Sequence, residues 1–388
     1  MATKKKEEVK EPKIKQIRAK EVPNAFVVSQ YYGFNAIDLP EIIKEDKEYA
    51  KKLRKDQKYE DESIPETEEN IALLRGYKER NFEEEHIDPV MLYCEGHAKG
   101  STRKPKRGEK VMNLHVIGTP KSIAEALLIK TTICILNEEG FKDVSVEINN
   151  LGGKEAVANF LRELTAYYRK NINEMDSECR QLFKDSTHAL VACGNTMKEE
   201  VKAQAPTPFN FLSDTSKGHL KEVVEFLDEE GISYDVNKDI LGNQNYSSST
   251  VFTIIDKKSG KILATGSRYN QLAKKTGHKR NVPGIGVTIK LQKPKTVPSS
   301  RLPKPDKVRF FFIQIGFAAK IKSLKVMEEL RKAKIPVHQS ISNDKLSVQL
   351  ARAKKFKVPY ILIMGQQEAQ DGTVVVRLSL IHISEPTR

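Results

Sequence analysis

Alternating apolar and polar residues predict that this chain is built from strands, short turns and amphipathic helices. Two apolar stretches, 90–96 and 111–118, enclose a basic loop and predict a hairpin with a long connection. The segment 241–291 predicts a second hairpin, which ends in a glycine-rich turn and one further strand. A strand that stops at a pair of glycines is predicted for 144–153, VSVEINNLGG.

Apolar residues at helical spacing predict helices around these strands. The segments 122–141 and 219–232 both contain a glycine close to their end, which suits a helix C-cap. A longer helix is predicted from Glu155 to about Phe183. In TEENIALLRGYKERN, Thr67 is the predicted N-cap, and acidic residues follow it in the first turn.

The order of these elements divides the chain into four parts. Residues 1–22 are rich in charge and poor in apolar side chains, so they are predicted to be a disordered basic tail. A globular part follows over 23–291. The four prolines of 292–306 predict a linker, because proline neither continues a helix nor joins a central strand. Strands and helices then alternate over 307–388, which predicts a small α/β domain.

Charge is the most informative feature of the composition. The formal net charge is +14 over 388 residues, which favours a nucleic acid partner over the alternative of a lysine-rich surface that serves only solubility. No run of 18 apolar residues and no apolar leader is present, so a cytoplasmic protein without membrane spans is expected. The four cysteines form no cluster with metal-ligand spacing, so no metal site and reduced thiols are expected.

With its elements in this order, the chain resembles a class II aminoacyl-tRNA synthetase of the histidyl type, from about residue 23 to residue 380. The resemblance rests on VSVEINNLGGKEAVANFLRELTAYY and HLKEVVEFLDEEGISYDVNKDIL, then on ELRKAKIPV, NDKLSVQLARAKKFKVPYILIMGQQE and GTVVVR. It implies an α+β fold, in which an antiparallel sheet flanked by helices carries a helical insertion at about 165–236. A small α/β anticodon-binding-like domain would follow this core. A homodimer is also implied, through a motif whose closing proline corresponds to Pro40.

Three arginine positions of the family hold other residues here. The family joins histidine to the α-phosphate of ATP with the help of Mg²⁺, and its arginines offset the phosphate charge. Its second-motif arginine falls near Gly100, the arginine of "RGLDYY" on Leu241, and that of "GLER" on Leu291. Losing one such group typically costs ~10²–10³ in rate. The resemblance therefore implies a divergent or catalytically degenerate paralogue. No residue is assigned a catalytic role, and ATP and Mg²⁺ are needed only if activity survives.

Several residues that match or neighbour the family's motifs remain candidates for a substrate pocket. They are Glu68, Arg103, Arg107, Gln244, Tyr246, Gly266, Arg268 and Tyr269. Glu68 matches the family's glutamate, but it would equally compensate charge at a helix N-terminus. The motif TGSRYNQL keeps the family's glycine-rich turn. The turn alone explains Gly266, whereas Arg268 and Tyr269 either line a pocket or pack in the core.

The helix predicted in KLSVQLARAKKFK carries the candidate tRNA contacts, which are Lys345, Arg352, Lys354, Lys355 and Lys357. Its apolar residues Leu346, Leu350 and Ala353 are expected to pack on the sheet. An ordinary basic surface helix is the alternative. The final residues 381–388, IHISEPTR, match nothing in the family and resemble a translated sequencing adaptor. We therefore expect an artefact at the end of a truncated domain.

Three functions stay open on this basis. The first is a histidyl-tRNA-synthetase-like protein that binds tRNA but does not ligate. The second is an active histidine–tRNA ligase of divergent type, in which Arg103, Arg107 or Lys290 replaces the missing arginines. The third is a histidine-sensing regulatory subunit like that of ATP phosphoribosyltransferase, which generally lacks a well-formed anticodon domain.

Overall fold

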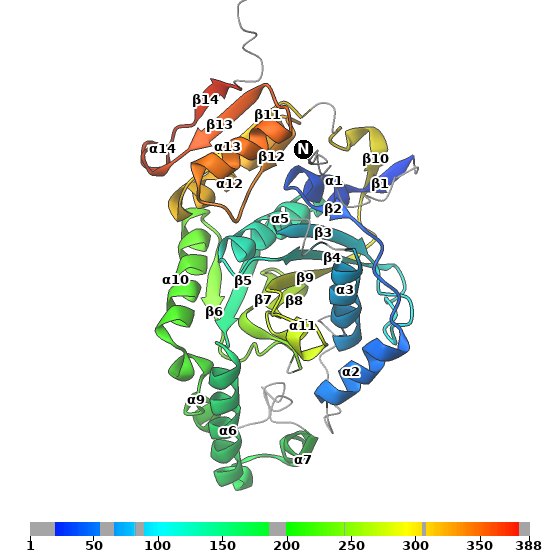
Figure 1. Ribbon diagram of the computed structural model, residues 1–388. Coiled ribbons are helices and arrows are strands. Elements are labelled where there is room, and N and C mark those ends of the chain that lie inside the picture. The colour runs from blue at the N-terminus through cyan, green and yellow to red at the C-terminus, as the bar shows by residue number, and fades with distance from the viewer. Residues whose placement is uncertain are drawn as a thin grey trace, which may run out of the picture.

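The computed structural model describes residues 20–54, 66–80, 82, 89–185, 199–243, 245–304 and 308–379. A large sheet covered by helices lies at the centre, and a smaller α/β domain sits against one side of it (Figure 1). The fold is mixed α+β, as the sequence predicts. The predictions for residues 1–19 and 381–388 fall outside the described residues.

The large sheet has eight strands in the order β2-β3-β4-β9-β8-β7-β5-β6. Neighbouring strands are antiparallel except at the two edges, where β2 runs parallel to β3 and β6 runs parallel to β5. The strands are β2 (Asn35–Ala36), β3 (Val90–Glu95), β4 (Glu109–Ile117), β5 (Val144–Asn150), β6 (Tyr234–Val236), β7 (Ser248–Asp256), β8 (Lys261–Arg268) and β9 (Gly284–Gln292). Both predicted hairpins are therefore confirmed.

One face of this sheet is apolar. Alternate residues of β9, from Ile285 to Leu291, are aliphatic and buried, as the two-residue repeat of a strand requires. This face packs against α5 (Ile123–Glu139), which is buried along most of its length and ends at Gly140 in a left-handed C-cap. The helices α1 (Asn24–Tyr31) and α10 (Asp214–Glu229) contact α5 in turn.

The opposite face is polar and is called the polar face below. It carries buried polar side chains from four adjacent strands, namely Asn113, His115, Thr253, Thr265, Ser267 and Thr288. The helices α3 (Thr67–Glu79) and α11 (Leu272–Lys275) pack over part of this face through one apolar cluster. The candidate pocket residues lie mostly around this face.

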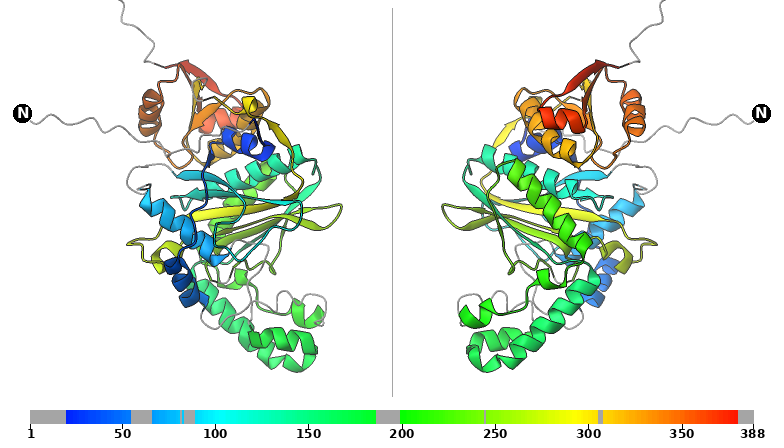
Figure 2. Two further views of the ribbon diagram at one scale, coloured as in Figure 1. Left: turned by 90° about the vertical axis from the view of Figure 1, so that its right-hand side faces the viewer. Right: turned by 90° about the vertical axis from the view of Figure 1, so that its left-hand side faces the viewer.

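The insertion region is helical but interrupted. It contains α6 (Lys154–Lys170), η1 (Ile172–Glu174), α7 (Ser177–Asp185), α9 (Glu199–Ala203) and η2 (Pro208–Phe211). The single helix predicted over 155–183 is wrong, because α6 ends before Asn171. Asn171 is its C-cap, and both its backbone amide (3.2 Å) and its side-chain amide (2.9 Å) donate to the Tyr167 carbonyl. Figure 2 shows α6 and α7 extending away from the sheet.

The C-terminal domain is a four-stranded sheet in the order β12-β11-β13-β14. Its elements are β11 (Phe310–Gln314), α12 (Phe317–Lys332), β12 (Val337–Gln339), α13 (Leu346–Lys355), β13 (Tyr360–Met364), α14 (Gln366–Asp371) and β14 (Val375–Leu378). The first three strands are parallel and β14 is antiparallel, so helices make the crossovers. The alternation of strands and helices predicted for this part of the chain, including the helix in KLSVQLARAKKFK, is confirmed.

The two parts of the molecule share an apolar core. Leu324 and Met327 of α12 belong to the same buried cluster as α1, α5 and the apolar face of the large sheet. A polar network joins the two parts beside this cluster. Tyr32 donates a hydrogen bond to Glu328 (2.9 Å), and Arg331 bonds to Glu328 (2.7 Å) and to Glu138 of α5 (3.0 Å). Burial raises the pKa of Glu328, but Arg331, Tyr32 and Cys134 together outweigh burial, so the pKa is lowered overall.

Short elements also occur in the predicted tail and linker. β10 (Thr296–Pro298) pairs antiparallel with β1 (Glu21–Pro23), and η3 (Ser299–Arg301) follows. Val22 is consequently buried, so the prediction of disorder is wrong for the end of the tail.

Cys94 and Cys134 are free and buried, whereas Cys179 is disulfide-bonded, so the prediction of reduced thiols is wrong for Cys179. Within the described part of the chain, no helix is long and apolar enough to cross a membrane.

Candidate functional site

Three carboxylates crowd the start of α3, and each is held by a partner from another segment. Glu68 forms a two-pronged ion pair with Arg54 of α2 (Lys44–Arg54), with N–O distances of 2.7 and 2.5 Å. Because both carboxylate oxygens are engaged, Glu68 faces a protein cation in this structure. This geometry gives it a structural role beyond compensating the helix terminus.

Glu66 and Glu69 fix the basic loop between β3 and β4. Glu69 accepts a hydrogen bond from the Ala98 amide (2.8 Å), and Glu66 accepts bonds from Ser101 (2.8 Å) and Thr102. Arg103 Nε lies 4.0 Å from Glu66. These two glutamates form a capping box, so Glu66 is the N-cap and the prediction of Thr67 is wrong by one residue.

The two candidate loop arginines therefore differ. The Arg103 side chain is 14% exposed and lies beside Glu66 at the start of α3. Arg107, at the other end of the loop, is exposed to solvent. The loop is tied down at its first half, so only Arg103 comes near the other candidate residues.

The segment before β7 turns apolar side chains inward. Leu241, at the family's arginine position, is 5% exposed and packs in an apolar cluster with Phe160 and Val251. Tyr246 is also buried, in the cluster beneath α3. Gln244 lies outside the described residues. This segment thus presents no cation from the position that the resemblance assigns to one.

Arg268 is fully buried on the side of the sheet that faces α5. It forms a two-pronged ion pair with Glu125 of α5 and donates to the carbonyls of Lys121 (2.8 Å) and Thr119 (3.1 Å). Glu125 also accepts from His219 (2.7 Å). Burial alone would raise the pKa of Glu125, but Arg268 and His219 lower it to about 2. Arg268 therefore stabilises the scaffold rather than lining the polar face.

Aromatic rings fill the space beside the glycines of the central strands. A Cβ at Gly266 would lie 2.3 Å from the Phe252 ring, and one at Gly284 would lie 2.2 Å from Tyr269. At Gly286 the neighbour is His115, at 2.4 Å. These glycines are thus required by close ring packing, and no open space lies above them.

Tyr269 and His115 form one buried pair on the polar face. The Tyr269 hydroxyl lies 3.1 Å from His115 Nδ1. Burial lowers the pKa of His115 to about 4 and raises that of Tyr269 far above its ordinary value. At neutral pH both rings are therefore uncharged, and the pair acts as packing with one internal hydrogen bond.

Replacing Gly284 with alanine is expected to lower the free energy of unfolding by ~1–3 kcal/mol, because the new methyl group would overlap the buried Tyr269 ring. Urea unfolding followed by circular dichroism measures this loss. Gly218→Ala is the matched control. A methyl group there meets nothing within 4 Å in α10, so stability should rise by ~0.5–1 kcal/mol. A Gly284→Ala variant as stable as wild type would show that Tyr269 moves aside easily.

Adjacent residues of β9 point to opposite faces. Leu291, at another expected arginine position, is 2% exposed and belongs to the apolar cluster under α5. Lys290 points to the polar face, where it pairs in register with Val111. Lys290 and the family's arginine position therefore lie on opposite faces of the sheet.

Two residues of the site were not singled out from the sequence. Lys275 of α11 is exposed, and its ammonium group donates a hydrogen bond to the Asn245 carbonyl (3.3 Å). Partial desolvation by its neighbours, then the charge of Lys154, lowers the pKa of Lys275. Asn245 also donates to Thr67 (3.2 Å), and its own side-chain oxygen is buried without a hydrogen bond. A lysine in a short helix gives no sequence signal for such a position.

These residues do not fit ATP with Mg²⁺. Leu241 and Leu291, at two of the family's arginine positions, are buried in apolar clusters. The carboxylates of Glu68 and Glu69 in α3 already accept hydrogen bonds from other protein groups. The Tyr269 ring occupies the space beside Gly284, and the His115 ring occupies the space beside Gly286. Among the described residues, no three histidine, cysteine or acidic side chains are grouped to hold a metal ion.

The C-terminal domain carries a second candidate surface on α13. Lys345, Lys354, Lys355 and Lys357 are exposed, while Arg352 is partly buried. Ala353 is buried against the sheet as predicted, but Leu346 is 42% exposed, so the prediction that it packs is wrong. It stands in the first turn, where buried Gln349 bonds to the Gln314 backbone and takes the inward position. Phe356 is 43% exposed and stacks on His338 at 4.1 Å, so an aromatic platform lies among these cations.

The large antiparallel sheet with its helices, followed by this domain, defines a class II aminoacyl-tRNA-synthetase-like fold with an anticodon-binding domain. Residues 311–378 match the family model described as "Anticodon binding domain". The apo histidyl-tRNA synthetase of S. aureus has a similar fold, with a TM-score of 0.50 and 19% identity over 92% of this chain and 90% of that one.

The relatives are histidine–tRNA ligases. The enzyme of Fervidobacterium nodosum is 26% identical over 80% of this chain and 72% of its own length. That of Bacillus subtilis is 23% identical over 80% of this chain and 75% of its own. The chain therefore resembles histidyl-tRNA synthetases along most of its length, as the sequence motifs indicate.

Proposed function

We propose that this protein binds tRNA through its C-terminal domain and does not activate histidine. The match of residues 311–378 to the anticodon-binding domain carries the proposal. The exposed lysines of α13 and the Phe356–His338 stack support it, because cations hold phosphates and aromatic faces stack on bases.

The surroundings of the two leucines at the family's arginine positions support the loss of adenylation. Leu241 and Leu291 are integral to two separate apolar clusters, so a guanidinium at either position would be buried without a partner. Glu68 forms an ion pair with Arg54, and Arg268 forms an ion pair with Glu125. Of the residues at the matched motif positions, the two arginines are thus replaced by buried leucines, and Glu68 and Arg268 are engaged within the fold.

Histidine-dependent ATP–pyrophosphate exchange tests this part of the proposal. We expect the purified protein to give no exchange above a reaction without histidine. Robust exchange that is abolished by Glu68→Ala would support the active ligase instead, with ATP and Mg²⁺ as its cofactors.

Sedimentation velocity would test the homodimer that the resemblance implies.

Charge reversal on α13 is expected to weaken tRNA binding. Lys354→Glu combined with Lys355→Glu should lower the affinity at least roughly tenfold. It should also reduce the slope of log affinity against log salt by about 2, since each lost phosphate contact removes about one unit. Gel shifts with total tRNA at several salt concentrations give both quantities.

The matched control is Lys258→Glu with Lys261→Glu. These exposed lysines lie around the β7–β8 hairpin turn, and the charge change is identical. We expect this control to bind tRNA as wild type does. If wild type itself forms no salt-sensitive complex with tRNA, the proposal fails and the histidine-sensing function gains support.

A further inference from the structure

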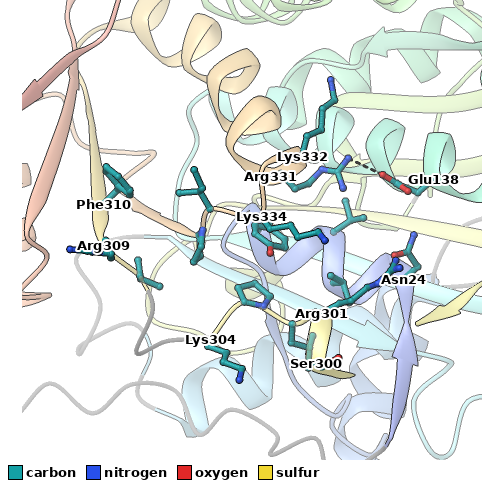
Figure 3. A pocket seen from close by; sticks show the side chains of 18 of the residues that line it. Asn24, Glu138, Ser300, Arg301, Lys304, Arg309, Phe310, Arg331, Lys332 and Lys334 are labelled. Carbon is teal, nitrogen blue, oxygen red and sulfur yellow. Dashed lines mark hydrogen bonds and ion pairs between the residues drawn. The ribbon is translucent and has the colours of Figure 1, made fainter. Parts of the chain in front are cut away.

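A large cavity lies between the core and the C-terminal domain. Its volume is about 1360 Å³, and its walls come from α1, the segment around η3, and the C-terminal domain (Figure 3). Residues just before β11, β12 and β13 line it, so the cavity opens at the amino ends of the three parallel strands. It is therefore separate from the polar face of the large sheet.

The cavity is strongly basic. Seven of the described residues that line it are arginine or lysine, and one, Glu138, is acidic. Arg331 is neutralised by Glu138 and Glu328, but Arg301, Lys334 and Lys357 form no ion pair with any described residue. The potential inside is thus positive, and it suits a ligand with several phosphate groups.

Two of these lysines adopt a backbone conformation that lysine disfavours. Lys334 has φ of 58° and Lys357 has φ of 51°, and each directly follows the last turn of a helix. Glycine is the usual residue there, because a side chain in the left-handed region is strained. The negative end of each helix dipole favours a cation at these positions. Lysine is present at both in spite of the strain, which points to a role for the charge of these side chains.

Aromatic groups complete the lining. Tyr31 of α1 and Phe310 of β11 both face the cavity. Phe310 stacks on Tyr360 at 5.4 Å, and the Arg309 guanidinium lies over the same Tyr360 ring at 5.6 Å. Inorganic phosphate or an acidic peptide would not need such a combination, whereas nucleobases stack on aromatic and guanidinium planes.

We propose that this cavity holds a single-stranded segment of RNA, with phosphates on Arg301, Lys334 and Lys357 and bases against Tyr31 and Phe310. The inference rests on the proposed RNA-binding function of the C-terminal domain and adds a second contact site to it. Lys357 belongs to both surfaces, so one strand could pass from α13 into the cavity.

Fluorescence anisotropy with a labelled 12-nucleotide single-stranded RNA tests the site, and the same titration with tRNA tests the proposed function. Arg301→Glu with Lys334→Glu should weaken single-strand binding at least tenfold, while Lys258→Glu with Lys261→Glu leaves it unchanged. Inorganic tripolyphosphate at equal phosphate concentration should compete poorly.

A second variant separates strain from binding. Lys334→Gly removes both the cation and the strained side chain, so it should raise the urea midpoint of unfolding while lowering RNA affinity severalfold. Unchanged single-strand affinity in Lys334→Gly and in the double variant would overturn the inference, even if tRNA binds through α13. Efficient competition by tripolyphosphate would overturn the assignment to RNA. If the single strand binds through the cavity but tRNA does not bind, the function proposed for α13 fails alone.

Discussion

Replacing Arg268 with methionine is expected to lower the free energy of unfolding by about 3–5 kcal/mol. The substitution leaves the fully buried Glu125 carboxylate without its main counter-charge, which is the costly way to break a buried ion pair. Combining Arg268→Met with Glu125→Leu should recover much of the loss, because both charges are then removed. Urea unfolding followed by circular dichroism measures all three variants.

The pH dependence of this loss provides an independent check. In the wild type, the pKa of Glu125 is lowered from 4.5 to about 2, so its stabilisation is complete above pH 4.5 and disappears as the pH falls towards 2. In Arg268→Met, burial dominates and the carboxyl binds a proton more readily. The stability difference between the two proteins should therefore shrink as the pH is lowered.

A matched control uses an exposed pair. Arg162, whose side chain is 71% exposed, pairs with Glu163, and Arg162→Met should change stability by less than ~0.5 kcal/mol. A loss below ~1 kcal/mol in Arg268→Met would instead indicate that Glu125 is neutral or hydrated, and Arg268 would again be a candidate for the pocket.

Placing an arginine at Leu291 is expected to destabilise the protein by several kcal/mol without restoring histidine activation. The side chain is 2% exposed within the apolar cluster under α5, so the guanidinium would be buried among aliphatic groups. Urea unfolding measures the stability of the variant, and ATP–pyrophosphate exchange measures its activity.

Lys290→Arg is the control on the same strand. This side chain points to the polar face, so we expect a change of less than ~1 kcal/mol and no exchange activity. A Leu291→Arg variant with wild-type stability and histidine-dependent exchange would contradict this assignment. It would show that the position can turn towards a nucleotide.

Strand positions were the most predictable part of the fold. The alternation in β9 fixes which face each residue occupies, and the glycine predicted to cap the helix over 122–141 is the C-cap of α5, Gly140. The residues at which helices begin and end were harder to predict, because neighbouring side chains compete for the capping positions. Asn171 is the C-cap of α6 and bonds to the Tyr167 carbonyl through both its backbone and its side chain. Glu66 replaces Thr67 as the N-cap of α3, because Glu69 completes a capping box with it.

Long-range pairing decided the roles of the candidate site residues. Arg268 stands in a motif that suggests a pocket, yet its partner Glu125 is 143 residues away on a helix that is buried from several sides. Glu68 likewise meets Arg54 only after α2 and α3 pack together. Neither carboxylate–guanidinium pair can be recognised in the sequence. The two partners of each pair lie on different elements, and the residue spacing within one element gives no information about the other.

The shared core beneath α12 has a consequence for how this molecule could diverge. Leu324 and Met327 pack into the same apolar cluster as α1, α5 and the central strands, and the Glu328–Arg331 network borders that contact. A shortened descendant without the large sheet would expose this surface to water. The C-terminal domain thus depends on the core for the burial of α12. Selection on the C-terminal domain alone would therefore also preserve the packing of the large sheet, whatever chemistry the sheet supports.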